Sequence, residues 1–433
     1  MSLQFITGGS GAGKSEYLSR LVCEESVRRP HDNFIVVVPE QYTMETQKKL
    51  VHMHSRKGIL NIDVVSFERL AYKVFEELGG GNRPVLDDTG KNLIVRRVLE
   101  KEKKKLDYFG SSIEKTGFVS ELKSVISELL QYGITPQQLG EIGENVKEKQ
   151  QLSAKLKDIR LVYKEFMAFL STNYITSEEI LDVLCGLVEK SKLIAGSEII
   201  FDGFTGFTPI QYKLMRLLLV YSKGIKISVT IDKKERPTGH EGWNNLFFMS
   251  KEMMNRLIAI CEEEGINVDD TVCVDRDINY RYEGAKDLAY LERNLFRYKG
   301  GVYTGTPENI RIYEGSNPKE ELQYIVSEIL QLTRKESFRY RDIAVVTADL
   351  ETYGKVAANM MKQNDIPAFL DYKRSVASNP YVEMLCSALE IVEKGYPYDT
   401  MFRYLRTGLT GISRHDIDML ENYCLAVGIR GSR

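Results

Sequence analysis

Two hydrophobic periods alternate along this chain, and each predicts one kind of element. Strand-length segments rich in apolar residues lie at 3–7, 34–38, 62–66, 198–202 and 225–232, and 34–38 (FIVVV) is a continuous apolar run. Such runs are typical of strands that are buried on both faces, as in a parallel sheet. Between them, apolar residues recur at helical spacing across 67–78 and 209–220. The alternation of strand and helix predicts an α/β fold.

The strand signals stop between residues 84 and 190, and long amphipathic helices take their place. Apolar residues recur at helical spacing across 118–129, for example. Thr135 followed by Pro136 is typical of a helix start, with an N-cap residue and a proline in the first helical position. The pattern predicts a helical insertion into the first domain. The predicted boundaries of this part of the chain are 1–83, 84–190 and 191–299.

A second α/β unit is predicted at 300–433, after the glycine pair Gly300-Gly301. Its predicted strands lie at 310–313, 343–347 and 368–370. Its predicted helices lie at 319–332 and 353–363, and a helical tail follows. These strands are too few to close a sheet. We therefore expect a partial second lobe in a truncated chain.

The composition is that of an ordinary globular protein, with 43% apolar and 28% charged residues in a chain of 433. A net charge of −2 argues against a wholly basic nucleic-acid-binding chain but leaves room for a local basic groove. The six cysteines are scattered without a C-x-x-C pair, which predicts reduced thiols and argues against a zinc site. No apolar run approaches the ~20 residues of a membrane span. We therefore expect a cytoplasmic protein that has no membrane partner.

A phosphate-binding motif lies almost at the start of the chain. Its residues read GGSGAGKS and are Gly8, Gly9, Ser10, Gly11, Ala12, Gly13, Lys14 and Ser15. They match G-x-x-x-x-G-K-[ST], between a predicted strand and a predicted helix, which is the context that this motif requires. Its glycines let backbone N–H groups surround phosphate, while Lys14 reaches the terminal phosphates and the Ser15 hydroxyl holds Mg²⁺. The expected ligands are ATP, or another nucleoside triphosphate, and Mg²⁺. The alternative is a glycine-rich turn with an incidental lysine.

The layout as a whole resembles a known helicase superfamily. A phosphate loop, an inserted helical subdomain, a return to the first sheet and a second α/β lobe are the arrangement of UvrD-type superfamily 1 DNA helicases. Those proteins bind ATP between two RecA-like lobes. The resemblance implies a RecA-like parallel sheet of the P-loop NTPase class, followed by the start of a second RecA-like lobe.

Local motifs narrow the resemblance to the AddB family of bacterial AddAB helicase–nucleases. The segments that carry it read VVVPEQYTMETQ (36–47), VVSFERLAYKV (64–74), IIFDGFTGFTPIQ (199–211), YRDIAVVTADLETY (340–353) and IPAFLD (366–371). The resemblance covers essentially the whole chain. It implies a subunit that processes DNA double-strand ends for recombinational repair, beside an AddA-like helicase–nuclease subunit as heterodimer partner. Family members continue into a nuclease domain with an iron–sulfur cluster, which we expect only in the missing C-terminal part of the parent protein.

The resemblance also allows the ATP-hydrolysing residues of UvrD-like proteins to be compared with those at Asp202. In an active UvrD-like motor this strand ends in Asp-Glu, where the aspartate supports Mg²⁺ and the glutamate activates the attacking water. Here Asp202 is followed by Gly203, so the base is missing. General-base assistance is worth about 10²–10⁴-fold, and we expect nucleotide binding with little or no hydrolysis. The alternatives are a turn-forming Asp-Gly pair and Glu40 as a substitute base.

Candidate DNA contacts follow the second and third predicted strands. In UvrD-like proteins these segments touch single-stranded DNA, and here they supply Thr43, Phe67 and Arg69. The polar side chains suit phosphate, and an aromatic ring can stack on a base. The alternative for Phe67 is a core position, as is common for an aromatic residue at a helix start.

Two other functions compete with the degenerate motor subunit. The first is a self-sufficient ATP-driven superfamily 1 helicase, which would show ATPase activity stimulated by single-stranded DNA. The second is a small-molecule P-loop kinase, against which the predicted second α/β lobe argues.

Overall fold

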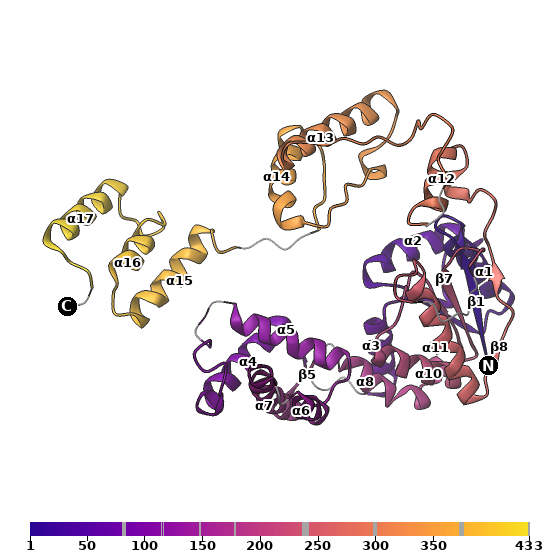
Figure 1. The fold of residues 1–433 in the computed structure, drawn as a ribbon, viewed down its shortest axis with the longest axis horizontal. Coiled ribbons are helices and arrows are strands. Elements are labelled where there is room, and N and C mark those ends of the chain that lie inside the picture. The colour runs from indigo at the N-terminus through magenta and orange to yellow at the C-terminus, as the bar shows by residue number, and fades with distance from the viewer. Residues whose placement is uncertain are drawn as a thin grey trace. The chain divides into compact units, whose positions relative to one another are not determined.

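The computed structural model describes residues 1–79, 84–113, 115, 117–146, 149–176, 179–235, 242–297, 301–371 and 376–431 (Figure 1). It divides into two compact units, Met1–Ile310 and Arg311–Arg433. Gly300, of the glycine pair before the predicted second unit, lies outside the described residues.

A seven-stranded sheet forms the centre of the first unit. Its order is β3-β2-β6-β7-β1-β8, with β9 also paired to β1, and every pairing is parallel. The strands are β1 (Ser2–Gly8), β2 (Asn33–Val37), β3 (Ile62–Val65), β6 (Ser197–Phe201), β7 (Gly224–Thr230), β8 (Asn267–Val268) and β9 (Val272–Cys273). The predicted α/β class is confirmed, and the predicted strands of this sheet are found within two residues of their expected bounds.

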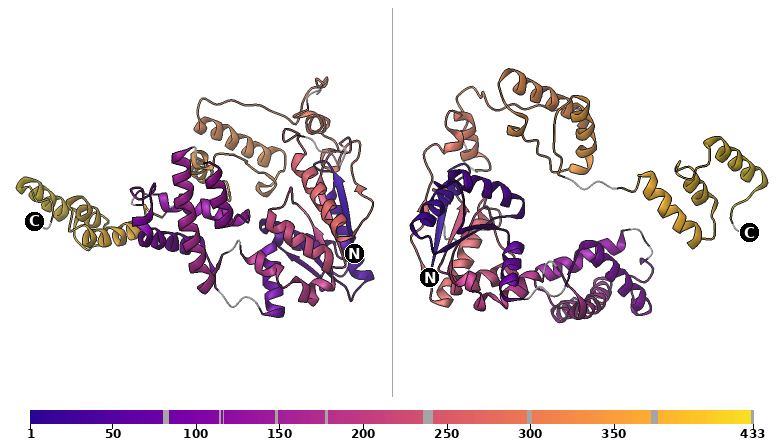
Figure 2. Two further views of the ribbon diagram at one scale, coloured as in Figure 1. Left: turned by 60° about the horizontal axis from the view of Figure 1, so that its bottom comes forward. Right: turned by 180° about the vertical axis from the view of Figure 1, so that it is seen from behind.

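Helices cover both faces of this sheet (Figures 1 and 2). The helices of the unit outside the insertion are α1 (Lys14–Arg28), α2 (Thr43–Met53), α3 (Phe67–Leu78), α8 (Ile180–Cys185), α9 (Lys192–Ala195), α10 (Pro209–Tyr221), α11 (Phe248–Glu264) and α12 (Lys286–Asn294). Short 3₁₀ turns are η1 (Glu40–Tyr42), η3 (Val188–Lys190) and η4 (Tyr280–Tyr282).

Successive residues of each strand point to opposite faces, so one strand supplies two cores. Ile35 and Val37 pack into a core that also contains buried residues of α3, α8, α10 and α11. Phe34 and Val36 pack into a second core with buried residues of α1 and α2. Burial on both faces explains why 34–38 reads as a continuous apolar run.

The parallel register brings the carboxyl ends of the central strands to one edge of the sheet. Gly8 of β1 lies opposite Thr230 of β7, and Val37 of β2 lies opposite Phe201 of β6. The residues that follow these strands therefore meet at this edge, which is where open α/β sheets bind ligands.

The insertion between α3 and α8 is helical, and its helices lie together in Figure 2. It consists of α4 (Asp88–Glu102), η2 (Lys103–Lys105), α5 (Phe118–Gln131), α6 (Pro136–Asn145) and α7 (Gln150–Asn173), with a small parallel pair β4 (Val85–Leu86) and β5 (Ile175–Thr176). These helices share their own core around Val95, Ile126 and Phe166. Leu184 and Val188, farther along the chain, pack into the core of the large sheet instead.

The second unit contains helices without a sheet in its described residues. They are α13 (Pro318–Lys335), η5 (Tyr340–Asp342), α14 (Leu350–Gln363), α15 (Pro380–Glu393), α16 (Tyr398–Leu405) and α17 (Arg414–Val427). The helices predicted at 319–332 and 353–363 are confirmed as α13 and α14. The strands predicted at 310–313, 343–347 and 368–370 are not formed. A strand needs a neighbour for its backbone hydrogen bonds, and Ile312, Val346 and Phe369 are exposed rather than packed against one.

Among the described residues, no helix combines the length and the apolar character needed to cross a membrane. All six cysteines have free thiols, and the three on α1, α8 and α11 are buried.

Candidate functional site

The glycine-rich loop joins the carboxyl end of β1 to the first turn of α1. Gly11 and Gly13 have left-handed backbones, with φ of 71° and 95°, a conformation that residues with a side chain rarely adopt. Gly13 is the N-cap residue of α1, and its carbonyl accepts the N–H of Tyr17 at 2.8 Å. The first N–H groups of the helix have no partner within the helix. Together with the positive end of the helix dipole, they favour an anion at this point.

The Lys14 side chain lies along this loop. Its Nζ donates hydrogen bonds to the carbonyl oxygens of Gly8 and Gly9, each at 2.9 Å. Burial lowers the pKa of Lys14, and the carboxylates of Asp202 and Asp275 partly offset this effect. The structure thus places a cation at the loop and two acids near it.

Asp202 follows β6 and is held in place by the neighbouring strand. The hydroxyl of Ser228 on β7 donates to Asp202 Oδ1 at 2.5 Å and accepts the N–H of Gly203 at 3.3 Å. Gly203 has a left-handed backbone, with φ of 83°. The sharp turn predicted for an Asp-Gly pair is therefore present, and it coexists with an aspartate near Lys14.

Glu40, the predicted substitute base, is paired elsewhere. Its Oε1 accepts a hydrogen bond from Arg69 Nε at 3.0 Å. More than half of the Glu40 side chain is exposed, as is that of Arg69. This pairing argues against Glu40 as a base at the phosphate loop.

A segment that sequence reasoning missed lies against the loop. Asp275 Oδ1 accepts the N–H of Gly9 at 2.7 Å, and Asp275 Oδ2 accepts the N–H of Lys233 just beyond β7 at 2.9 Å. Asn279 Nδ2 donates to the carbonyl oxygen of Ser10 at 3.3 Å. The contacts with Gly9 and Ser10 join residues that are more than 260 positions apart in the sequence. These contacts hold the first turn of the loop against the segment after β9, and Asp275 also joins that turn to the end of β7.

Tyr280 and Arg281 extend this contact along the loop. The Arg281 N–H donates to the carbonyl oxygen of Gly11 at 3.3 Å, and a Cβ built on Gly11 would lie 2.5 Å from the Arg281 Cβ. The Tyr280 ring would lie 3.3 Å from a Cβ built on Gly13. Close packing therefore excludes a side chain at Gly11, whereas at Gly13 the positive φ is the stronger constraint. The only signal in the sequence was a polar, aromatic and basic triplet, 279–281, after a strand too short to predict.

The predicted DNA contacts differ in their exposure. Arg69 is exposed and lines a groove of about 460 Å³ beside the edge strand β3, together with Tyr72 and Lys73. Thr43 is only 4% exposed, and its hydroxyl donates to the carbonyl oxygen of Glu40 at 3.0 Å. Arg69 is thus presented to solvent, whereas Thr43 shapes the turn before α2.

Phe67 is 7% exposed and belongs to an aromatic cluster. Its ring centroid lies 5.7 Å from that of Phe201, 5.4 Å from that of Phe204 and 6.1 Å from that of Phe207. This burial favours the core position that was the alternative to a DNA contact.

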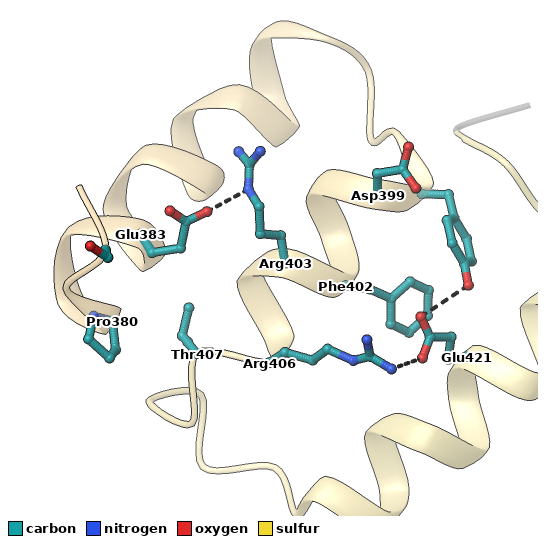
Figure 3. A pocket seen from close by; sticks show the side chains of 10 residues that line it. Pro380, Glu383, Asp399, Phe402, Arg403, Arg406, Thr407 and Glu421 are labelled. Carbon is teal, nitrogen blue, oxygen red and sulfur yellow. Dashed lines mark hydrogen bonds and ion pairs between the residues drawn. The ribbon is translucent and has the colours of Figure 1, made fainter. Parts of the chain in front are cut away.

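A separate cavity of about 480 Å³ lies among α15, α16 and α17 of the second unit (Figure 3). The two arginines of this cavity, on or just after α16, are paired with acids of α15 and α17. Arg403 contacts Glu383 at 2.5 Å, and Arg406 pairs with Glu421, which also accepts the Tyr398 hydroxyl at 3.1 Å. Because these charges satisfy one another, the cavity offers no cation directed at a ligand.

The chain is similar to known proteins over its whole length. The family model described as "ADDB, N-terminal" matches residues 5–292. A protein of Lachnoclostridium phytofermentans, named as a subunit of an ATP-dependent helicase/deoxyribonuclease, is 42% identical over 434 residues, covering 100% of this chain and 38% of that protein. The proteins of the same name from Caldanaerobacter subterraneus and Clostridioides difficile are 37% and 36% identical, each over 100% of this chain, with 37% and 38% of their own lengths covered. The chain thus spans little more than a third of the length of these relatives.

Proposed function

The chain belongs to the AddB N-terminal family, and from this premise we propose that it is the nucleotide- and DNA-binding N-terminal part of a helicase/deoxyribonuclease subunit. The parent enzyme would process DNA double-strand ends for recombinational repair in the bacterial cytoplasm. The name shared by the relatives calls them ATP-dependent, and it calls each of them a subunit. It supports the use of ATP, action on DNA and the presence of another subunit, for which we propose an AddA-like helicase–nuclease.

One observation carries the nucleotide-binding role. Lys14 and the left-handed glycines Gly11 and Gly13 form an anion site between β1 and α1. The carboxyl ends of β1, β6 and β7 meet at the same edge, so Asp202 and Arg281 lie beside this site. A triphosphate bound there would place its charge next to the cations of the loop.

Mg²⁺ fits the two oxygen donors that the site offers. The Ser15 hydroxyl and the Asp202 carboxylate are hard oxygen ligands, and Ser228 orients the Asp202 carboxylate. We propose that both residues hold the ion beside the phosphates, where it would neutralise phosphate charge. We assign no iron–sulfur cluster to this chain, because its six cysteines lie on separate elements; the resemblance assigns the cluster to another part of the parent protein.

The proposed site binds ATP but hydrolyses it slowly. Gly203 carries no carboxylate, and Glu40 is paired with Arg69. Without a base, the attacking water loses assistance that is typically worth about 10²–10⁴-fold. The bound nucleotide would therefore serve structure or signalling within the subunit more than movement along DNA.

Titration of the full chain with a fluorescent ATP analogue in the presence of Mg²⁺ tests the nucleotide-binding proposal. We expect saturable binding that Lys14→Ala weakens about 100-fold, because a charged hydrogen bond contributes about 1.5–3 kcal/mol. Arg20→Ala, on the exposed side of α1, is the matched control. Equal affinity of the chain and of Lys14→Ala would contradict the proposal.

The self-sufficient helicase is favoured by one specific observation. The Arg281 guanidinium lies at the phosphate loop, 3.4 Å from the Ser10 hydroxyl and within the first unit. An arginine that contacts the transferred phosphoryl group is worth about 10³–10⁵-fold. Steady-state ATPase activity that single-stranded DNA stimulates, and that Lys14→Ala abolishes, would establish this alternative.

For DNA we propose a contact at the groove beside β3. Arg69 is exposed there next to Tyr72 and Lys73, which provide an aromatic ring and a second cation. Phosphate would replace the carboxylates of Glu40 and Asp63, with which Arg69 and Lys73 form exposed ion pairs. We predict that Arg69→Glu weakens binding of single-stranded DNA and lowers the slope of log affinity against log salt by about one phosphate contact. Fluorescence anisotropy across a salt series measures this. Arg216→Glu, on α10, is the control; equal losses in both variants would argue against a specific contact.

A further inference from the structure

A carboxylate on α12 contacts the phosphate loop itself. It belongs to Glu292, whose charge interacts with the Lys14 ammonium of the loop. Its Oε1 would lie 3.1 Å from a Cβ built on Gly9, so the carboxylate packs directly on the loop backbone. Glu292 thus places a carboxylate against the loop whose N–H groups are expected to surround phosphate.

Charged groups from every neighbouring element surround Glu292. Asp275 comes from the segment after β9, Asp232 from the end of β7 and Arg293 from α12 itself. Lys14 of α1 and Arg281 of η4 belong to the same cluster. Burial raises the pKa of Glu292, and repulsion from Asp232 and Asp275 adds to this, while the Ser10 N–H and Arg293 oppose it. The surroundings of Glu292 therefore favour its neutral form.

We propose that Glu292 is a specificity-determining residue of the nucleotide site, which weakens the binding of anionic phosphate while its carboxylate is charged and in contact with the loop. The inference rests on the nucleotide-binding role proposed above. The charged carboxylate attracts Lys14, the cation that is expected to reach the phosphates. It also repels a second anion placed a few ångströms away. Nucleotide binding therefore requires Glu292 to take up a proton or to leave the loop.

This competition sets the direction of a pH effect. A carboxyl whose pKa is raised in the nucleotide-free protein is charged at high pH and takes up a proton as the pH falls. Phosphate binding favours the neutral form, so affinity rises as the pH falls. Lys14 also gains charge in that direction, and the γ-phosphate of ATP titrates too. Only the part of the pH dependence that disappears in Glu292→Gln belongs to Glu292.

The test is a titration of the full chain with a methylanthraniloyl-labelled ATP and Mg²⁺ at about pH 8 and about pH 6. Glu292→Gln keeps the size of the side chain but removes its charge. We expect it to bind about tenfold more tightly than the unsubstituted chain at the higher pH, with a smaller change between the two pH values. Glu283→Gln carries the same change of net charge at an exposed position of the preceding segment and should leave affinity unchanged.

The outcomes separate this inference from the proposed function. If the chain binds in a Lys14-dependent manner but Glu292→Gln matches it at both pH values, the inference fails alone. If neither protein binds, the proposed function fails as well. Should Glu292→Gln not fold, as judged by its melting curve, Glu292→Asp retains the charge but has a shorter reach. It should withdraw from the loop backbone at Gly9 and tighten binding, and unchanged affinity would overturn the inference.

Discussion

Gly203 stands at the position where an active motor of this type would carry its base, and its backbone is suited to glycine. Its φ of 83° lies in the left-handed region, and its N–H is held by the Ser228 hydroxyl that also orients Asp202. The turn thus holds Asp202, the proposed metal ligand, in place while the next position carries no carboxylate.

We predict that Gly203→Ala lowers the free energy of unfolding by about 1–2 kcal/mol, because a Cβ disfavours the left-handed conformation. A steric clash is not the cause, since the nearest atom, on Pro39, would lie at an ordinary 3.5 Å. Urea titration measures the loss. Gly206→Ala in the same loop is the control, since Gly206 has no positive φ and its Cβ would meet Met249 at 3.7 Å. Equal stabilities of the two variants would contradict this explanation.

At the scale of elements, the sequence was most informative where burial is greatest. The strands of the large sheet were predicted because both of their faces are covered, and α3 was predicted at its observed bounds because its apolar residues lie on one face. The glycine loop was predicted from a local motif that needs only eight residues. These features depend on neighbours in the sequence.

The segment after β9 could not be predicted in the same way. β8 and β9 are two residues long, which is too short for a hydrophobic period. The contacts of Asp275, Asn279 and Glu292 with the phosphate loop depend on the return of the chain to β1. The second unit shows the opposite error, since apolar runs at 343–347 and 368–370 predicted strands that have no partner in the described residues.

Glu77, near the end of α3, contacts the start of α9. These two helices precede and follow the helical insertion in the sequence. The Glu77 carboxylate accepts the Ser191 hydroxyl at 2.6 Å and the Lys192 N–H at 2.8 Å, and it caps α9. Burial alone would raise the pKa of Glu77, but these hydrogen bonds outweigh it and hold the pKa below its usual range. A carboxyl whose pKa is lowered in the folded state stabilises the protein above its unfolded pKa, and this stabilisation is lost as the pH falls through the folded value.

We predict that Glu77→Ala lowers the free energy of unfolding at neutral pH by about 1 kcal/mol, the usual cost of losing a helix cap. The difference from the unsubstituted chain should shrink in acid, below the usual carboxyl range. Urea titrations at two pH values measure it, with the exposed neighbour Glu76→Ala as control. A difference that stays constant with pH would show that the carboxylate is not the source.

At the scale of the molecule, every group assigned to the nucleotide site lies in the first unit. Lys14, Asp202, Asp275, Arg281 and Glu292 all precede its end at Ile310. Asp287 of α12 further accepts the N–H groups of Glu308 and Asn309, at 2.9 Å and 2.7 Å, which ties the last residues of the unit to the helix that carries Glu292.

We predict that a protein of residues 1–310 folds and binds the ATP analogue within about threefold of the full chain, a difference of about 0.6 kcal/mol. Equilibrium titration of both proteins measures this, and Lys14→Ala in the shorter protein is the control. A large loss of affinity would mean that residues of the second unit complete the site.

A single-turnover experiment tests most directly whether the chain binds ATP without hydrolysing it. The full chain, in excess over radiolabelled ATP and with Mg²⁺ and single-stranded DNA present, is quenched at successive times, and free phosphate is separated from intact nucleotide. We predict that ATP is bound in a Lys14-dependent manner and is recovered intact. Release of phosphate faster than about 1 s⁻¹, the lower end of common enzyme rates, and its loss in Lys14→Ala, would show that the chain carries a working base and would contradict this prediction.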